Sequence, residues 1–342
     1  MLTIESLKNS LSLPVIGAPL FIISGPELVT AQCKAGIVGS FPALNARPQH
    51  VLDTWLKTIK DDLGAYREMN PGKKVAPFAV NQICHNSNDR LWKDMELCVK
   101  HEVPIIITSL RPPADIVKAA HSYGGLVFHD VINVRHAMKA AEQGIDGLIL
   151  VCAGAGGHAG TLSPFALVRE VKPWFKGAIL LSGAISDGYG IASAIALGAD
   201  FAYLGTRFIA TQEANASPEY KQMLIDSTAE DIIYSSLFTG VHGNYLKPSV
   251  SAAGLDPSNL PMADKSTMDF GSGGNMEKKV WKDIWGAGQG VGGIHDAPTT
   301  ADIINRMRSE FEQASRQFAA YSARFSENNE SYAPVSQKRM IS

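Results

Sequence analysis

The sequence predicts an α/β fold, a (β/α)8 or TIM barrel with a smaller substrate or lid domain inserted after strand eight. Eight short apolar runs, each bounded by glycine or proline, are typical of buried parallel strands. Helical patterns separate these runs, and eight such units favour a closed barrel over an open sheet. An open dinucleotide-binding sheet would carry G-x-G-x-x-G after its first strand, whereas this chain has Ala18-Pro19-Leu20-Phe21 there.

The order of elements follows from these runs and from the residues that begin and end helices. The predicted strands are 13–18, 37–41, 75–80, 104–108, 125–128, 147–152, 178–181 and 201–204. Pro26 opens the first helix, and the later helices are predicted at 48–63, 89–99, 114–122, 133–143, 164–172 and 187–197. Gly36, Gly144 and Gly198 follow helices at the position of a left-handed C-cap.

The eighth helix does not follow the eighth strand directly. Residues 213–297 mix helical pieces with loops rich in glycine, serine and proline, and an amphipathic helix comes only at about 298–322. One face of that helix carries Ile303, Ile304, Met307, Phe311, Ala314 and Phe318. We therefore expect residues 1–212 and 298–326 to form the barrel, 213–297 a lid at its C-terminal face, and 327–342 a polar tail.

Composition excludes several classes of protein. The 342 residues include 31 Lys and Arg against 33 Asp and Glu, a net charge of −2 that argues against nucleic-acid binding. No run approaches about 18 consecutive apolar residues, so no membrane span is expected. The first residues lack the pattern of a secretory signal, which makes a cytoplasmic location the expectation. The cysteines (Cys33, Cys84, Cys98 and Cys152) show neither disulfide-framework nor zinc-ligand spacing, and Cys33 and Cys98 are expected to be buried in helices.

Two glycine turns follow strands seven and eight. They are Ser182-Gly183-Ala184-Ile185 and Gly205-Thr206-Arg207. In barrels these two loops often build a phosphate site, because glycine lets backbone N–H groups approach phosphate oxygens closely. Each glycine alone could be an ordinary turn residue, and it is the pair that predicts an anion site.

The loop after strand six, Gly154-Ala155-Gly156-Gly157-His158-Ala159-Gly160, leaves room for a flat ligand and carries one titratable side chain. A lone histidine is most often structural. At the C-terminal end of a barrel strand, however, His158 is placed for general base chemistry near neutral pH.

Other segments offer surface rather than reactive groups. Ala18, Pro19 and Leu20 could line an aromatic ring system, and the Asn81 amide can both donate to and accept from a heterocycle edge. The glycine-rich segment around Gln289 follows no strand, so it is weak as a dinucleotide motif but could fold over a bound ring. The chain has no P-loop or H-E-x-x-H motif, and Ser182 lies in no G-x-S-x-G elbow.

Four segments together resemble the nitronate monooxygenase (2-nitropropane dioxygenase) family of flavin-dependent barrels. They are Pro14-Val15-Ile16-Gly17-Ala18-Pro19, Ala155-Gly156-Gly157-His158-Ala159-Gly160, Ser182-Gly183-Ala184-Ile185 with Gly198-Ala199-Asp200, and Gly205-Thr206-Arg207-Phe208-Ile209-Ala210-Thr211. The resemblance implies FMN at the barrel mouth and oxidation of alkyl nitronates, or nitroalkanes, by O2 to a carbonyl compound and nitrite. It implies that His158 is the active-site histidine, either a base or a group that holds the anion.

The resemblance also implies a set of cofactor contacts. The phosphate would lie on Gly183, Ala184, Gly205 and Thr206, and the ring near Ala18, Pro19, Leu20, Asn81 and Gln289, with Gly156, Gly157 and Ser182 completing the site. The chain departs from relatives at two places: Asp130 stands where many of them have a lysine, and the end of strand six, Val151-Cys152, lacks the acidic residue that some of them have there.

Those departures leave two other functions open. One is an NAD(P)H-dependent flavin reductase of quinones or enoyl thioesters, and the other is a flavin-binding or sensing module without turnover. The expected partners are a small-molecule substrate and O2, with NAD(P)H for the reductase. A homodimer is left open.

Overall fold

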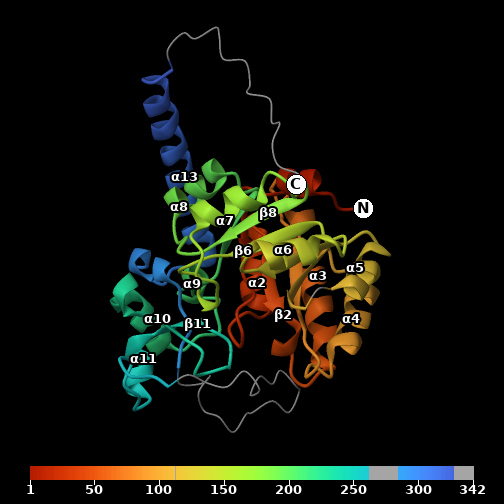
Figure 1. Cartoon of the computed structure of the whole chain (residues 1–342). Coiled ribbons are helices and arrows are strands. Elements are labelled where there is room, and N and C mark those ends of the chain that lie inside the picture. Colours follow the sequence, from red (N-terminus) through yellow and green to blue (C-terminus); the bar gives the residue numbers. More distant parts are fainter. Residues whose placement is uncertain (112, 262–283, 327–342) are drawn as a thin grey trace, which may run out of the picture.

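The computed structural model describes residues 1–111, 113–261 and 284–326, and within them eight parallel strands form a barrel (Figure 1). The strands are β1 (Val15–Gly17), β2 (Gly39–Pro42), β3 (Phe78–Cys84), β4 (Ile105–Leu110), β5 (Leu126–Val131), β6 (Gly147–Val151), β8 (Ala178–Ser182) and β9 (Phe201–Leu204). Their order is β1-β9-β8-β6-β5-β4-β3-β2. A parallel bridge between Ile16 and Val38 joins β1 to β2, so the ring is closed as predicted.

Helices surround the barrel in the predicted order. They are α2 (Pro26–Lys34), α3 (Val51–Met69), α4 (Leu91–Lys100), α5 (Ala114–His121), α6 (Val134–Ala141), α7 (Pro164–Val171), α8 (Gly188–Leu197) and α13 (Thr300–Ala323). The hydrophobic core therefore has two layers, one inside the barrel and one between the strands and the helices. On β5, Leu126 and Phe128 pack inside the barrel, whereas Val127 and Val131 pack beneath the helices together with Cys33 and Cys98. The prediction that these two cysteines are buried is confirmed.

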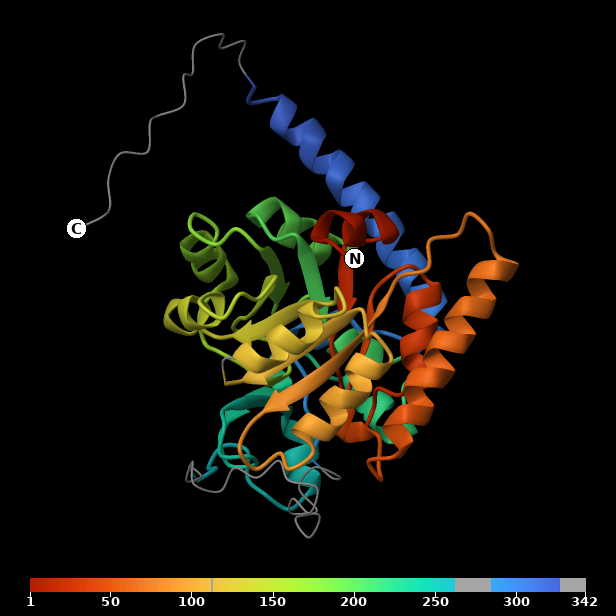
Figure 2. The same ribbon diagram turned by 90° about the vertical axis from the view of Figure 1, so that its right-hand side faces the viewer.

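A short helix, α1 (Ile4–Ser10), was not predicted and covers the N-terminal end of the barrel (Figure 2). Thr3 caps it by accepting from the N–H of Ser6. Its Leu7 belongs to the apolar cluster inside the barrel, and Lys8 binds Asp200 at 2.7 Å. Seven residues are too few to show a clear helical period in the sequence.

The inserted segment forms a second, three-stranded sheet at the opposite end of the barrel from α1 (Figure 1). It includes α10 (Pro218–Asp226), β10 (Ile232–Ser235), β11 (Gly243–Leu246) and α11 (Lys247–Ala252). The third strand, β7 (Gly157–His158), comes from the loop after β6, and it pairs with β11 through Gly243 and Asn244. The glycine loop is therefore part of the small sheet and not a free loop.

The last helix, α13, closes the barrel only along its first half. Met307 is buried, whereas Phe318 is 65% exposed, so the prediction that Phe318 lies on the buried face was wrong. The reason is geometric, because the helix continues past the edge of the barrel and away from the body (Figures 1 and 2). In the described parts of the chain, no helix has the length and apolar character needed to cross a bilayer.

Candidate functional site at the barrel mouth

Three loops meet at the C-terminal ends of β6, β8 and β9, where active sites of barrels lie. The carbonyl of Gly154, after β6, accepts the N–H of Gln289 at 2.8 Å and that of Ala184 at 3.3 Å. The hydroxyl of Thr206, after β9, accepts the N–H of Gly288 at 2.9 Å. The segment that returns from the insertion, including the short helix η4 (Gln289–Gly293), is thus fastened to all three strand ends.

The two predicted glycine turns lie side by side, because β8 and β9 are neighbours. Gly183 has a φ of 141°, a conformation that L side chains rarely adopt. Among the described residues, the N–H groups of Gly183, Gly205 and Thr206 donate to no backbone or side-chain acceptor. Three uncommitted backbone donors at adjacent strand ends are what a phosphate group needs. The N–H of Ala184 is already engaged by Gly154, so it is the weakest donor of the predicted set.

The glycines also permit close contact between loops. A Cβ on Gly156 would lie 2.9 Å from the Gly288 nitrogen and 3.0 Å from the Thr206 hydroxyl. A Cβ on Gly205 would lie 3.3 Å from Leu20 and 3.5 Å from Ala18. The turn after β9 is therefore close to the end of the first strand, where the cofactor ring was predicted.

His158 comes to the mouth on β7, opposite Gly243 of the insertion. Its Nε2 lies 2.8 Å from Oγ1 of Thr239, in the connection between β10 and β11. The side chain is partly buried, and burial lowers the pKa of His158 to about 4. The imidazole is therefore neutral at neutral pH, which is the form that can accept a proton.

A polar network lies across the ends of β3, β4 and β5. Asn81 donates through Nδ2 to the Ser109 hydroxyl at 3.0 Å and to the Ile107 carbonyl at 3.4 Å. Asp130 lies on the neighbouring strand β5, where hydrogen bonding to Ser109 and to the backbone of Leu110 acts to lower the pKa of its carboxyl group. Burial raises the pKa of Asp130 to about 6, and these hydrogen bonds only partly oppose that rise.

The structure brings most of the predicted site residues into two groups. Gly156, Ala184, Thr206 and Gln289 meet around Gly154, and Ala18 and Leu20 meet Gly205. Gly157 precedes His158 on β7, Pro19 lies between Ala18 and Leu20, and Ser182 ends β8 and accepts the Cys152 N–H. Asn81 lies on β3. Around the barrel, β1 and β2 lie between β3 and β9, and the Asn81 side chain contacts β4.

Sequence reasoning missed Ser109 and Thr239. Ser109 lies one residue beyond the predicted end of strand four, and the rule that strand ends line the mouth would have indicated it. No pattern in the sequence marks Thr239 as a site residue, because its contact with His158 depends on how the insertion folds back.

The sequence model of the nitronate monooxygenase family matches residues 5–310. The chain belongs to the nitronate monooxygenase family. A nitronate monooxygenase of Paraburkholderia phytofirmans is 25% identical over 362 residues, covering 90% of this chain and 94% of that protein. Members of the family are flavin-dependent oxidoreductases, which agrees with the predicted class of enzyme.

Solved structures confirm the predicted fold. A nitroalkane oxidase of Streptomyces ansochromogenes superimposes with a TM-score of 0.75 at 19% identity, over 92% of this chain and 99% of that one. The FabK structure from Thermotoga maritima gives a TM-score of 0.73 at 20% identity, over 94% and 99% of the two chains. At these identities the likeness concerns the barrel and its inserted domain alone.

Proposed function

We propose that this protein uses bound FMN to oxidise alkyl nitronates with O2, releasing a carbonyl compound and nitrite. The observation that carries the proposal is the placement of a neutral His158 at the same mouth as the uncommitted donors of Gly183, Gly205 and Thr206. Membership of the nitronate monooxygenase family supports the same reaction.

The residues at the mouth fit FMN as the cofactor. Backbone N–H groups of Gly183, Gly205 and Thr206 would hold its phosphate. Gly156 packs against Gly288 and Thr206, and the open space beside Gly157 would leave room for the cofactor. Ala18, Pro19 and Leu20 would line one part of the ring site, with Asn81 and Gln289 at its polar edges, and Ser182 and Ala184 would complete the turn after β8. A bound flavin would supply the redox chemistry that couples oxidation of the substrate to reduction of O2.

His158 would act on the substrate and not on the phosphate. In its neutral form it can remove the α-proton of a nitroalkane, which gives the nitronate. A substrate that arrives as the nitronate needs no such step, and an imidazole N–H would then donate a hydrogen bond to its negative oxygens. Thr239 holds the ring from the side of the insertion in either case.

We further propose that the described parts of the insertion, residues 213–261 and 284–297, act as a lid that sets which substrates enter; the predicted insertion also includes 262–283, which lie outside the described residues. The basis is that β7 carries His158 and is also the third strand of the inserted sheet. A movement of that sheet would move His158 with it, so closing the lid and placing the imidazole would be one event.

Absorption spectra followed by anaerobic mixing test the proposal. The purified protein should show a flavin spectrum, should release FMN on denaturation, and should bleach on addition of propyl-2-nitronate. Bleaching by NADH or NADPH but not by nitronate would instead make the protein a reductase of quinones or enoyl thioesters. A flavin that responds to none of these donors would identify a binding module, and a protein that takes up no flavin would overturn the proposal.

A further inference from the structure

The C-terminal half of α13 extends beyond the edge of the barrel, at the end covered by α1 and opposite the insertion (Figures 1 and 2). Every residue from 315 to 326 is exposed in the described chain. The residues that match the nitronate monooxygenase family end at 310, so this half of the helix lies outside the matched part. Helices in water owe most of their stability to the packing of an apolar face, and an exposed half of this kind therefore calls for a partner.

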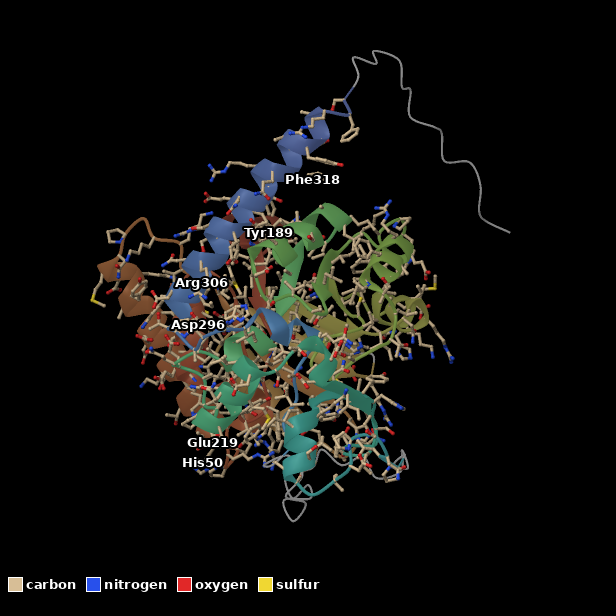
Figure 3. All side chains as sticks on the ribbon, turned by 90° about the vertical axis from the view of Figure 1, so that its left-hand side faces the viewer. His50, Tyr189, Glu219, Asp296, Arg306 and Phe318 are labelled. Atoms are coloured by element: carbon tan, nitrogen blue, oxygen red, sulfur yellow. The ribbon has the colours of Figure 1, made fainter. Side chains whose placement is uncertain are left out.

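The apolar positions of α13 recur at alternating spacings of three and four residues along the whole helix. They are Ile304, Met307, Phe311, Ala314, Phe318, Tyr321 and Phe325. This is the seven-residue repeat of coiled coils, which places all of these side chains on a single stripe. Ile304 and Met307 are buried against the barrel, whereas Phe318, Tyr321 and Phe325 are 65%, 59% and 69% exposed. The stripe that packs on the barrel therefore continues into solvent (Figure 3).

Charged side chains are almost absent from the exposed part of this stripe and from its borders. Tyr321 and Phe325 pack against each other, with ring centroids 5.0 Å apart. Arg316 lies on the opposite side of the helix by its position in the repeat, and it pairs with Glu312 at 3.1 Å. The positions that border the stripe carry Ser315, Gln317, Ser322 and Arg324. A second copy of the helix would therefore meet no row of like charges.

We propose that the exposed half of α13 is a homodimerisation helix, on which Phe318, Tyr321 and Phe325 dock the same helix of a second copy in antiparallel orientation. This surface lies at the opposite end of the barrel from the mouth, so both mouths stay open in the dimer (Figure 1). The inference does not depend on the flavin chemistry proposed above.

The order of side-chain sizes along the stripe suits an antiparallel copy. When Phe318 of one helix faces Tyr321 of the other, Ala314 of the first faces Phe325 of the second. A large ring then lies opposite a small methyl group at both ends of the contact, and aromatic rings meet in its centre. One register therefore pairs all of the exposed rings.

The barrel excludes a parallel pair. The first part of the stripe, which includes Met307, already packs on the chain's own barrel, where a parallel second helix would have to lie. In the antiparallel register the two helices overlap only over residues 314–325. The two Phe311 side chains, which mark the barrel edges, are then about 25 Å apart along the axis, at about 1.5 Å per residue. The two barrels therefore do not collide.

The area and the rest of the chain favour a second copy as the partner. The exposed parts of the three rings amount to roughly 400 Å² on each copy. Pairing would thus cover about 800 Å² of ring surface, and the bordering side chains bring the contact close to the roughly 1,000 Å² that a specific interface needs. Residues 327–342 carry no apolar repeat that matches the stripe, and they contain Pro334.

Sedimentation velocity of the full chain tests the proposal over roughly 1–100 μM, the range expected for a contact of this size. The wild-type protein should pass from monomer to dimer within it. Phe318→Asp should raise the dissociation constant at least about 30-fold, as for a central interface residue. Ala320→Asp places the same charge off the stripe and should dimerise like the wild type. Both side chains are exposed in the monomer, so both variants should keep the wild-type melting temperature at low concentration.

Spin labels distinguish the antiparallel pair from a parallel one. Gln313→Cys and Ala320→Cys lie one seven-residue repeat apart at equivalent exposed positions, and the four native cysteines are buried. In the antiparallel register the two labels at 320 lie at almost the same height, whereas those at 313 are offset by about 20 Å along the axis. Pulsed electron paramagnetic resonance should therefore give a longer distance at 313 than at 320.

Three results would overturn the inference. They are a wild-type chain that stays monomeric throughout the concentration range, equal dissociation constants for Phe318→Asp and Ala320→Asp, and equal label distances at 313 and 320. If a monomeric wild-type chain became dimeric only after removal of residues 327–342, the tail would be the natural occupant of the stripe, and the inference would be overturned as well.

Discussion

His158 Nε2 lies 2.8 Å from Oγ1 of Thr239, and the same hydroxyl lies 3.0 Å from the carbonyl oxygen of Val241. When the single hydroxyl proton is donated to Val241, the oxygen accepts from an N–H on Nε2 of the imidazole. This tautomer leaves Nδ1 as the basic nitrogen. The contact with Thr239 therefore links the tautomer of His158 to the fold of the insertion.

Replacing His158 by asparagine should separate cofactor binding from turnover. His158→Asn keeps a polar side chain at the mouth but removes the base, so the variant should retain FMN and lose about 10²-fold or more of its turnover on a neutral nitroalkane. Steady-state O2 consumption with nitroethane measures the loss, and the flavin spectrum confirms that the cofactor is present. Full nitroalkane turnover in this variant would exclude His158 as the base.

Thr239→Val should weaken the reaction without weakening cofactor binding. Valine has nearly the shape of threonine but cannot accept from His158, and the loss of one hydrogen bond that orients the ring should lower kcat/KM about tenfold. Thr239→Ser retains the hydroxyl and should remain close to wild type. Equal activities of the valine and serine variants would show that the hydroxyl has no role in orienting the imidazole.

The pH profile on a neutral nitroalkane should reflect the buried imidazole. Burial lowers the pKa of His158 to about 4, so the base is free above that pH and protonated below it. Turnover should not decline between pH 8 and 6 through protonation of His158, and it should fall as the pH drops through about 4. Initial rates after brief exposure to each buffer, with recovery on return to pH 7, distinguish titration from unfolding. A loss of rate centred between pH 6 and 7 that persists in Asp130→Asn would show that His158 titrates at its ordinary pKa.

The sequence predicted the barrel because each strand is buried on both faces and bounded by residues that break strands. The apolar run at 125–128 corresponds to the start of β5, and its alternation of Leu126 and Phe128 with Val127 places both core layers. The strand β7 could not be predicted, since Gly157 and His158 alone have no period and their partner, β11, lies about 85 residues later.

Backbone geometry is the part of the candidate site that sequence patterns can indicate. The turns at Gly183 and Gly205 need particular residue types at strand ends, and the structure puts them on adjacent strands. Contacts between side chains far apart in sequence could not be predicted, as with Asn81, whose amide donates to Ser109 on β4. Phe318 continues the apolar stripe of the last helix. It is exposed because the helix has passed the edge of the barrel at that point, and the sequence does not show how far the barrel extends.

Acid should weaken the attachment of α1 to the barrel. Burial tends to raise the pKa of Asp200, but hydrogen bonds from Lys8 and from the N–H of Ile179 outweigh it, so the pKa is lowered. A lowered folded-state pKa gives stability that is present above the unfolded pKa and is lost as the pH falls through the folded one. Asp200→Asn should therefore cost about 1–3 kcal/mol at pH 7 and much less near pH 3.

Urea unfolding at the two pH values measures the free-energy difference for Asp200→Asn. Asp62→Asn provides the control, because Asp62 is exposed and, among the described residues, its ion pair is with Lys34 at the surface. That variant should change the unfolding free energy by less than about 1 kcal/mol. Equal costs for Asp200→Asn at both pH values would show that the stabilisation does not come from the ionised carboxylate.

The buried guanidinium of Arg207 should be required both for stability and for FMN binding. Arg207 is 1% exposed, and its Nη2 donates to the carbonyl of Ala210 at 2.7 Å and to that of Asp296 at 2.6 Å. It directly follows Thr206 on α9 (Thr206–Ile209) and fixes the chain that returns from the insertion. Arg306 of α13 binds the carboxylate of the same Asp296 at 2.6 Å, but from the surface (Figure 3).

Arg207→Lys keeps the charge but cannot reach both carbonyls with a planar fork, so it should cost about 3 kcal/mol of stability and weaken FMN binding by displacing Thr206. Arg306→Lys changes the exposed member of the same cluster and should cost less than about 1 kcal/mol. Thermal unfolding with and without FMN compares the two variants. The two arginines share Asp296 as a partner. If both variants lowered the unfolding free energy by a similar small amount, the stabilisation would come from the surface ion pair, and the hydrogen bonds from Arg207 to the buried carbonyls would contribute nothing measurable.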